Sequence, residues 1–315
     1  MARSNFEYTM LRLALSRLAA AIPTLFLLIA LAFFMMRAAP GGPFDTERSL
    51  PPEVLAQLEQ AYHLDEPLWQ QLARYMGGVL RGDLGPSYQY SDYSVNELIM
   101  QGLPVSLRVG GGAMLLALLV GTLAGVVAAL RQNHFIDHAV MTLAMTGMSI
   151  PVFVVAPLLI LLFAVTLGML PAGGWQNGSL RELVLPVVAL SLPQIAIIAR
   201  LTRGSMIEVL SSNYIRTARA KGLTTRAVVM RHALRPAMLP VLSYLGPAAA
   251  GIITGSVVIE QIFGIPGIGR YFVQAALNRD YTLVMGVVVF YGSLIIVFNF
   301  LVDLLYGVLD PRVGK

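Results

Sequence analysis

Few side chains in this sequence could perform covalent or metal chemistry. The chain has four scattered histidines and no cysteine, which removes disulfides, thiolate metal sites and thiol catalysis. His134 and His138 have the i,i+4 spacing of a helical metal site, but they flank Asp137 beside an apolar run and are interpreted as an interfacial loop. The sequence has no GxxxxGKS or GxxxxGKT phosphate loop, no HExxH and no GxSxG. We therefore expect no catalytic residue, no metal and no cofactor bound by this chain.

The clearest chemical pattern is a basic loop. Residues 200–236 contain eight basic residues and one acid, Glu208, a net charge of +7. The loop lies between two apolar runs that are each long enough to cross a membrane. Short loops rich in Lys and Arg stay on the cytoplasmic side. We therefore expect this loop to face the cytoplasm, where a soluble motor protein could push on it.

The middle of the loop predicts helix, glycine turn, helix. The hydroxyls of Ser211 and Ser212 can cap a helix that runs to Lys221, and Gly222 can take the left-handed conformation that ends it. Thr224 or Thr225 can then cap a second helix that leads into the fifth span. One face of the first helix is predicted to be apolar, formed by Tyr214, Ile215 and Ala218. The residues expected near water or lipid headgroups are Arg216, Arg219, Lys221 and Arg226. Composition alone also fits an anchor on anionic lipid, where each cation contributes about 1 kcal/mol.

The elements around this loop are predicted to be membrane spans. Of the 315 residues, 57% are hydrophobic and 12% charged, whereas soluble domains have about 25% charged residues. The mean hydropathy is +0.71. A net charge of +5 could indicate nucleic acid, but the basic residues lie beside apolar spans, so we expect no nucleic-acid partner. We predict an all-α integral membrane protein with six spans, at about 18–36, 109–130, 139–170, 183–199, 238–262 and 283–306.

The third span is ambiguous, because residues 138–180 contain no acid, lysine or arginine and could hide two short spans. We expect one span, tilted or broken near Pro151 and Pro157. Residues 38–103 carry three basic and nine acidic residues, a net charge of −6. With six spans and a cytoplasmic N-terminus, both basic segments lie inside. A seventh span would place the most basic loop outside, against the Lys and Arg bias.

The predicted domains follow from these spans. Residues 1–37 hold the N-terminal segment and an uncleaved first span, and residues 38–103 form a small helical cap on the outer face. The cap is expected to be either a structural lid or a docking surface for a soluble partner. The remaining segments are the core of spans two to six at 104–306, with its cytoplasmic loop 200–236, and a cytoplasmic tail at 307–315.

The basic loop resembles the EAA loop of binding-protein-dependent ABC importer permeases. Ala218 matches the second alanine of that motif and Gly222 its glycine, whereas Arg216 replaces the glutamate and Thr217 the first alanine. RTARAKGL is the form typical of the peptide-importer branch. Further stretches that resemble this branch are FFMMRAAPGGPF from Phe33, GDLGPSY from Gly82, RLTRGSMIEVL from Arg200, GSVVIEQIFGIPGIGR from Gly255, NRDY from Asn278 and VDLLYGVLDPR from Val302. Together they are similar to the B-type membrane subunits of oligopeptide importers.

This resemblance implies a type I ABC importer permease fold in the cell inner membrane, with both termini cytoplasmic. It implies a homologous C-type permease subunit, two ATPase subunits that hold ATP and Mg, an extracytoplasmic peptide-binding protein and an oligopeptide substrate. It also implies that the loop at 211–222 couples to an ATPase. The coupling residues are then Tyr214, Ile215, Arg216, Thr217, Ala218, Arg219, Ala220, Lys221 and Gly222.

A second candidate site lies at the outer end of the fifth span, where Glu260 precedes the sequence FGIPGIG. The glycines and proline predict an irregular re-entrant turn. Such backbone is tolerated at membrane depth only beside protein or a water-filled cavity. We expect Glu260, Gly264, Pro266 and Gly267 to line the outer mouth of a translocation path, although a structural pairing of Glu260 is the competing interpretation.

Three other functions compete with the oligopeptide importer. The chain could serve an importer of dipeptides, glutathione or nickel within the same family. It could be a secondary transporter driven by an ion gradient, but such folds often show inverted repeats, and neither a repeat nor a midplane carboxylate is evident. It could also be a structural membrane scaffold.

Overall fold

The computed structural model describes residues 2–39, 41–44, 51–90, 92–176 and 178–309, with side chains from residue 15 to residue 305 in these ranges. Every regular element in this part of the chain is a helix, apart from one isolated antiparallel bridge between Pro86 and Ser94. The prediction of an all-α protein is confirmed.

Among the described residues, five helices are long and apolar enough to cross a membrane. They are α1 (Ala2–Ala38), α4 (Val95–Leu130), α7 (Leu180–Leu210), α11 (Leu239–Phe263) and α13 (Tyr281–Leu309). A sixth candidate is a bent pair, formed by α5 (Phe135–Ser149) and by α6 (Val152–Leu159) with its π-helical continuation η1 (Ile160–Thr166). With this pair counted as one span, the described residues contain the six predicted spans.

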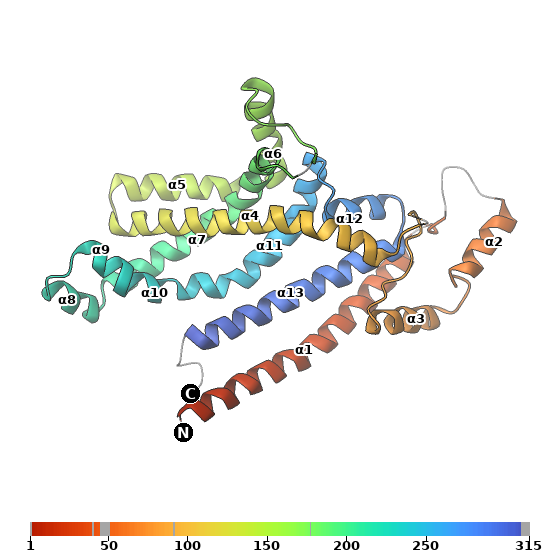
Figure 1. Ribbon diagram of the computed structural model, residues 1–315, viewed down its shortest axis with the longest axis horizontal. Helices are drawn as coiled ribbons and strands as arrows, with labels where there is room; N and C mark the ends of the chain where they lie inside the picture. Colours follow the sequence, from red (N-terminus) through yellow and green to blue (C-terminus); the bar gives the residue numbers. More distant parts are fainter. Residues whose placement is uncertain (1, 40, 45–50, 91, 177, 310–315) are drawn as a thin grey trace.

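The break in the third span lies at Pro151. The two halves are bent by 103°, and Figure 1 shows α6 turning away from the direction of α5. Proline has no N–H to donate to the preceding turn, and it forces the residue before it into an extended conformation. Ile150 accordingly has φ −91° and ψ 122°. Pro157 lies inside α6 and does not end it.

Two helices extend beyond the predicted spans. α4 begins at Val95 rather than near Val109, so the boundary drawn between residues 103 and 104 falls inside this helix. A capping box sets its start: the Ser94 hydroxyl accepts from the Glu97 N–H at 3.3 Å, and the Glu97 carboxylate accepts from the Ser94 N–H at 2.8 Å. α7 likewise continues past Arg200 to Leu210, because charged residues are tolerated once a helix leaves the hydrocarbon.

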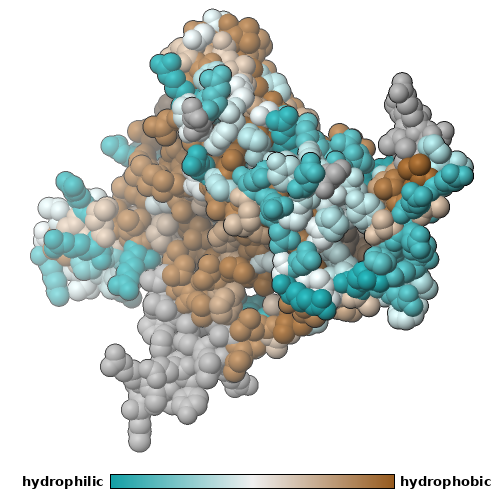
Figure 2. Space-filling view, turned by 45° about the vertical axis from the view of Figure 1, so that its right-hand side comes forward, coloured by the Kyte–Doolittle hydropathy of each residue, from teal (hydrophilic) through white to brown (hydrophobic). Residues whose placement is uncertain are grey.

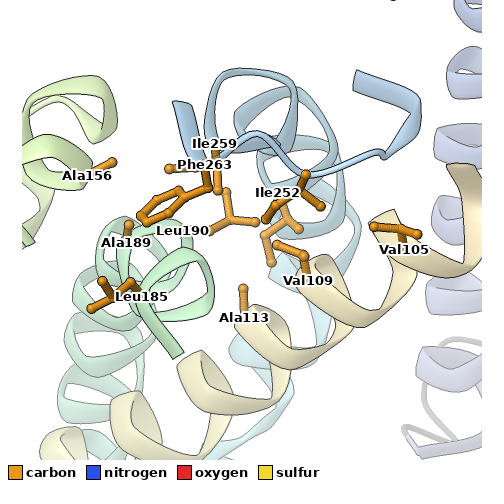
Figure 3. Packing of buried hydrophobic residues seen from close by; sticks show 11 residues of the cluster. Val105, Val109, Ala113, Ala156, Leu185, Ala189, Leu190, Ile252, Ile259 and Phe263 are labelled. Carbon is orange, nitrogen blue, oxygen red and sulfur yellow. The ribbon is translucent and has the colours of Figure 1, made fainter. Parts of the chain in front are cut away.

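The core of the bundle lies where α4, α7 and α11 meet near their outer ends. Figure 3 shows apolar side chains from these helices and from α6 filling the space between them. Glycines bring α4 and α7 into close contact farther along. A Cβ on Gly125 would lie 2.5 Å from the Ala199 carbonyl oxygen, so only glycine fits there without a shift.

The bundle has two polar ends. Figure 1 places the basic loop with α8 (Asn213–Ala220), α9 (Thr225–Ala227) and α10 (Leu234–Ala237) at one end, toward which the start of α1 and the last described turn of α13 also lie. The other end carries α2 (Pro52–Ala61), α3 (Leu68–Leu80) and α12 (Ile268–Leu277). Figure 2 shows a broad hydrophobic belt between hydrophilic ends. This arrangement agrees with the predicted topology.

Candidate functional site

The basic loop is centred on the short helix α8. Ser212 has the extended backbone of an N-cap, with φ −69° and ψ 155°. Its hydroxyl was predicted to cap this helix, and that prediction is wrong: Ser212 Oγ donates to the Val209 carbonyl at 2.6 Å, back into the preceding helix. Gly222 ends the helix as predicted, since its φ of +80° is in the left-handed region that glycine favours.

The second helix of the loop is interrupted by a π-helical segment. Thr224 caps it as predicted, because its hydroxyl accepts from the Ala227 N–H at 3.4 Å. α9 then passes into η2 (Val228–Ala233) and α10 before α11 begins. Pro236 cannot donate a backbone hydrogen bond, which favours an irregular ladder in this segment. The loop is therefore a helix, a glycine turn and a distorted helix.

The apolar face of α8 packs against the helix bundle. Ile215 is 0% exposed and Ala218 is 7% exposed, and they pack in a cluster with Ala129 of α4, Met206 of α7 and Val228. Tyr214 was predicted to share this face but is 47% exposed. One residue along a helix corresponds to about 100° of rotation, so adjacent Tyr214 and Ile215 cannot point in the same direction. A push on α8 would reach α4 and α7 through this cluster.

The outward side of α8 is exposed and basic. Exposed residues on it and at its end are Tyr214, Arg216, Thr217, Arg219, Ala220, Lys221 and Gly222. None of the three cations forms a salt bridge with a residue that the structure describes. This surface can bind acidic side chains or phosphate groups. Of the nine predicted coupling residues, Ile215 and Ala218 are buried against the bundle. The other seven are exposed and remain available to a partner.

A partly buried ion pair lies close to this site on α7 and was missed by the sequence analysis. Arg203 of α7 donates two hydrogen bonds to Asp137, which lies in the first turn of α5 and is 1% exposed. The Asn133 N–H also donates to this carboxylate, at 2.9 Å. The pair holds the turn between α4 and α5 against the helix that leads into the basic loop.

The predicted irregular turn is present at the outer end of α11. Gly264, with φ +64°, ends α11, and α12 begins directly after Gly267. Glu260 is completely buried, and its Oε2 accepts from the Gly269 N–H at 2.8 Å. The Ile268 N–H donates to Ser106 Oγ of α4 at 2.9 Å. Side chains of two spans thus hold the start of α12. The role of this turn in a translocation path remains a prediction.

A cleft of about 490 Å³ opens between α4, α11 and α13. Its walls are mostly apolar, and Gly110 and Gly111 of α4 line it without side chains. The hydroxyl-bearing residues on its surface are Ser106, Ser256 and Tyr291, which lie toward the end that carries Glu260. The sequence analysis did not predict this cleft, because its walls come from helices that are far apart in the sequence.

Metal ligands do not gather among the described residues: no group of three or more His, Asp or Glu side chains is close enough to hold an ion. His134 and His138 are both exposed, and Asp137 between them is engaged by Arg203.

Known families and relatives match most of this chain. Residues 121–315 match the family described as binding-protein-dependent transport system inner membrane component, and residues 10–109 match the N-terminal family of such membrane components. The oligopeptide transport system permease protein OppB of Salmonella typhimurium is 59% identical over 304 residues, with 96% of this chain and 99% of the relative covered. The dipeptide transport system permease protein DppB of Bacillus subtilis is 47% identical, with 96% and 98% covered.

The fold is also found among solved structures. The MetNI methionine ABC transporter, in an inward-facing conformation, superposes with a TM-score of 0.54 at 19% identity. The match covers 68% of this chain and 96% of the other. At this identity the likeness shows a shared permease fold and nothing about substrate.

Proposed function

Because this chain belongs to the family of binding-protein-dependent transport system inner membrane components, we propose that it is the permease subunit of an ABC importer that carries oligopeptides across the cell inner membrane. The observation that carries the proposal is the 59% identity to an oligopeptide permease over 96% of the chain. The chain supplies a path and performs no covalent chemistry. ATP and Mg belong to separate ATPase subunits.

The other subunits are inferred from the family. A homologous permease subunit would complete the membrane unit, two ATPases would bind the cytoplasmic side, and an extracytoplasmic peptide-binding protein would dock on the cap. The outward face of α8 supports the ATPase contact, because its cations Arg216, Arg219 and Lys221 have no salt-bridge partner among the described residues. An acidic groove on the ATPase would complement this face.

The docking of α8 supports a mechanism of coupling. The ATPases approach each other when they bind ATP and carry α8 with them. Ile215 and Ala218 transmit this movement to Met206 of α7 and Ala129 of α4, since all four pack in one cluster. Closely packed helices move as rigid bodies between discrete arrangements. The spans would then tilt and open the path outward, and hydrolysis would restore the inward-facing state.

The coupling proposal is tested by Gly222→Asp and Arg219→Glu. Asparagine and aspartate adopt positive φ at a cost, and both changes add negative charge where an acidic groove is expected. Each variant should insert normally but lose most peptide uptake and co-purify less ATPase. Arg231→Glu is the matched control, because Arg231 is exposed in the same loop but lies outside α8. Normal uptake by both α8 variants would exclude this helix as the coupling element.

Substrate and energy source need separate measurements. Cells that lack the gene and are complemented with it should take up a series of peptides from two residues upward, with longer peptides preferred over dipeptides, glutathione and nickel. The 47% identity to a dipeptide permease makes a dipeptide the second candidate substrate. Inhibition by vanadate would support an ATPase-driven importer, whereas collapse with a proton uncoupler would support an ion-driven transporter. An unchanged uptake on deletion would leave only a scaffold role.

A further inference from the structure

Glu260 is a buried carboxylate without a counter-ion. It lies near the outer end of a membrane span and is 0% exposed, and none of the salt bridges among the described residues includes it. One oxygen, Oε2, accepts from the Gly269 N–H, while Oε1 has no hydrogen-bond partner in the described part of the chain. Burying an unpaired charge is costly, and ionisable residues inside membrane proteins usually mark substrate or ion pathways.

In the other two buried acids of the described chain, both carboxylate oxygens accept hydrogen bonds. Asp137 forms two hydrogen bonds with Arg203. Asp280 accepts from the Ser87 hydroxyl and from the N–H groups of Gln89 and Leu283. Glu260 differs from these two acids because its Oε1 is buried without a hydrogen-bond partner among the described residues.

Hydroxyl groups from two other spans surround this carboxylate. A Cβ on Gly267 would clash with Glu260 Oε2 and would lie 2.6 Å from Ser106 Oγ, so all three residues meet at one point. Tyr291 of α13 lies near both Glu260 and Ser256, and its hydroxyl is buried. Ser106 and Tyr291, together with Ser256, line the cleft between α4, α11 and α13.

We propose that Glu260 and these hydroxyl groups form a site for the α-ammonium group of the peptide as it enters the cleft. The inference rests on the proposed peptide transport. An ammonium group has three donors and one positive charge, which match a carboxylate oxygen and neighbouring hydroxyl acceptors. Every unmodified peptide carries this group whatever its sequence. One carboxylate without further acids suits an ammonium group better than a divalent metal, which takes several oxygen ligands.

The site is closed in this structure. The turn at 264–267 covers the carboxylate, and the start of α12 is fastened to Glu260 and to Ser106. The ammonium group therefore reaches Glu260 when the outer end of the cleft opens and α12 moves away. It would replace the Gly269 N–H as the donor to this carboxylate.

The test is uptake of one peptide in two forms, with a free or an acetylated N-terminus, by the complete transporter with its own binding protein. Because the binding protein is the same in every arm, a change in the ratio of the two rates between variants reports on the permease. Glu260→Gln keeps an acceptor for the Gly269 N–H but removes the charge. We expect it to lower the preference for the free peptide about tenfold, the loss that corresponds to one charge-assisted hydrogen bond.

Glu260→Asp keeps the carboxylate and should retain a preference for the free peptide, and Tyr291→Phe should lower that preference by a smaller factor. An unchanged ratio in Glu260→Gln would overturn the proposal. A fall in both rates by equal factors in Glu260→Gln and Glu260→Asp would overturn it as well, since it would indicate a purely structural cap on α12. Absence of any peptide uptake by the wild-type complex would instead reject the proposed function.

Discussion

Arg203 and Asp137 join two membrane helices through a bidentate ion pair, with Nε to Oδ1 and Nη2 to Oδ2 distances of 2.6 Å each. Arg203 lies on α7 close to Met206, which is buried beneath the short helix α8. The start of α5 is thereby fastened to the helix that receives α8. A displacement of α8 would move α4, α5 and α7 together rather than α7 alone.

We predict that Arg203→Gln destabilises the permease by about 3 kcal/mol, because it leaves the Asp137 carboxylate buried without its charge partner. Thermal unfolding of the detergent-solubilised protein, followed by loss of the monodisperse peak, measures this effect. The exchange Asp137→Arg with Arg203→Asp restores opposite charges and should recover part of the stability. Equal stability of Arg203→Gln and wild type would show that the ion pair does not hold these helices.

The contact between α4 and α7 gives a second prediction. Gly125→Leu should destabilise the bundle by 1–3 kcal/mol or more, on the order of other overpacked cores, because even a Cβ there lies 2.6 Å from Thr202 Cβ. Gly204→Ala on α7 is the control, since no atom lies within 4 Å of its Cβ position. Membrane levels and thermal unfolding of the two variants should differ clearly. Similar behaviour would mean that α4 and α7 do not depend on this close approach.

The absence of native cysteine permits a direct test of topology. Gln57→Cys on α2 and Arg226→Cys in the basic loop each place one thiol at an exposed position. A membrane-impermeant maleimide added from outside should label the thiol at position 57 in intact spheroplasts. The thiol at position 226 should react only after the membrane is opened. The reverse pattern would place the basic loop outside and remove its contact with an ATPase.

The spans and the end of α8 could be predicted because their signals are local. Some 20 consecutive apolar residues define a span, and Gly222 ends a helix without help from distant residues. The sequence also contained the true start of α4, since Ser94 and Glu97 have the spacing of a capping box. That start was missed because the span was traced from its apolar residues, which begin to dominate only near Val109.

Other features depend on contacts between distant segments. The sequence separates Asp137 from Arg203 by 66 positions, and only the packing of α5 on α7 brings them together. The Ser212 hydroxyl could either cap α8 or bond to the preceding helix, and it donates to the Val209 carbonyl of that preceding helix. The orientation of Tyr214 likewise depends on which side of α8 meets α4 and α7. Single-sequence reasoning could identify these residues but could not choose their partners.

Tyr214 and Ile215 provide the last prediction, because these adjacent residues point to different sides of α8. Ile215→Ala removes a buried side chain from the cluster with Met206 and should cost 2–5 kcal/mol, a typical range for such truncations, so that α8 docks poorly. Tyr214→Ala removes a half-exposed ring and should leave the thermal stability of the isolated permease unchanged. If the outward face of α8 binds the ATPase, Tyr214→Ala should still lower the amount of ATPase that co-purifies. Loss of stability in Tyr214→Ala, or normal stability in Ile215→Ala, would reverse the assignment of the two faces.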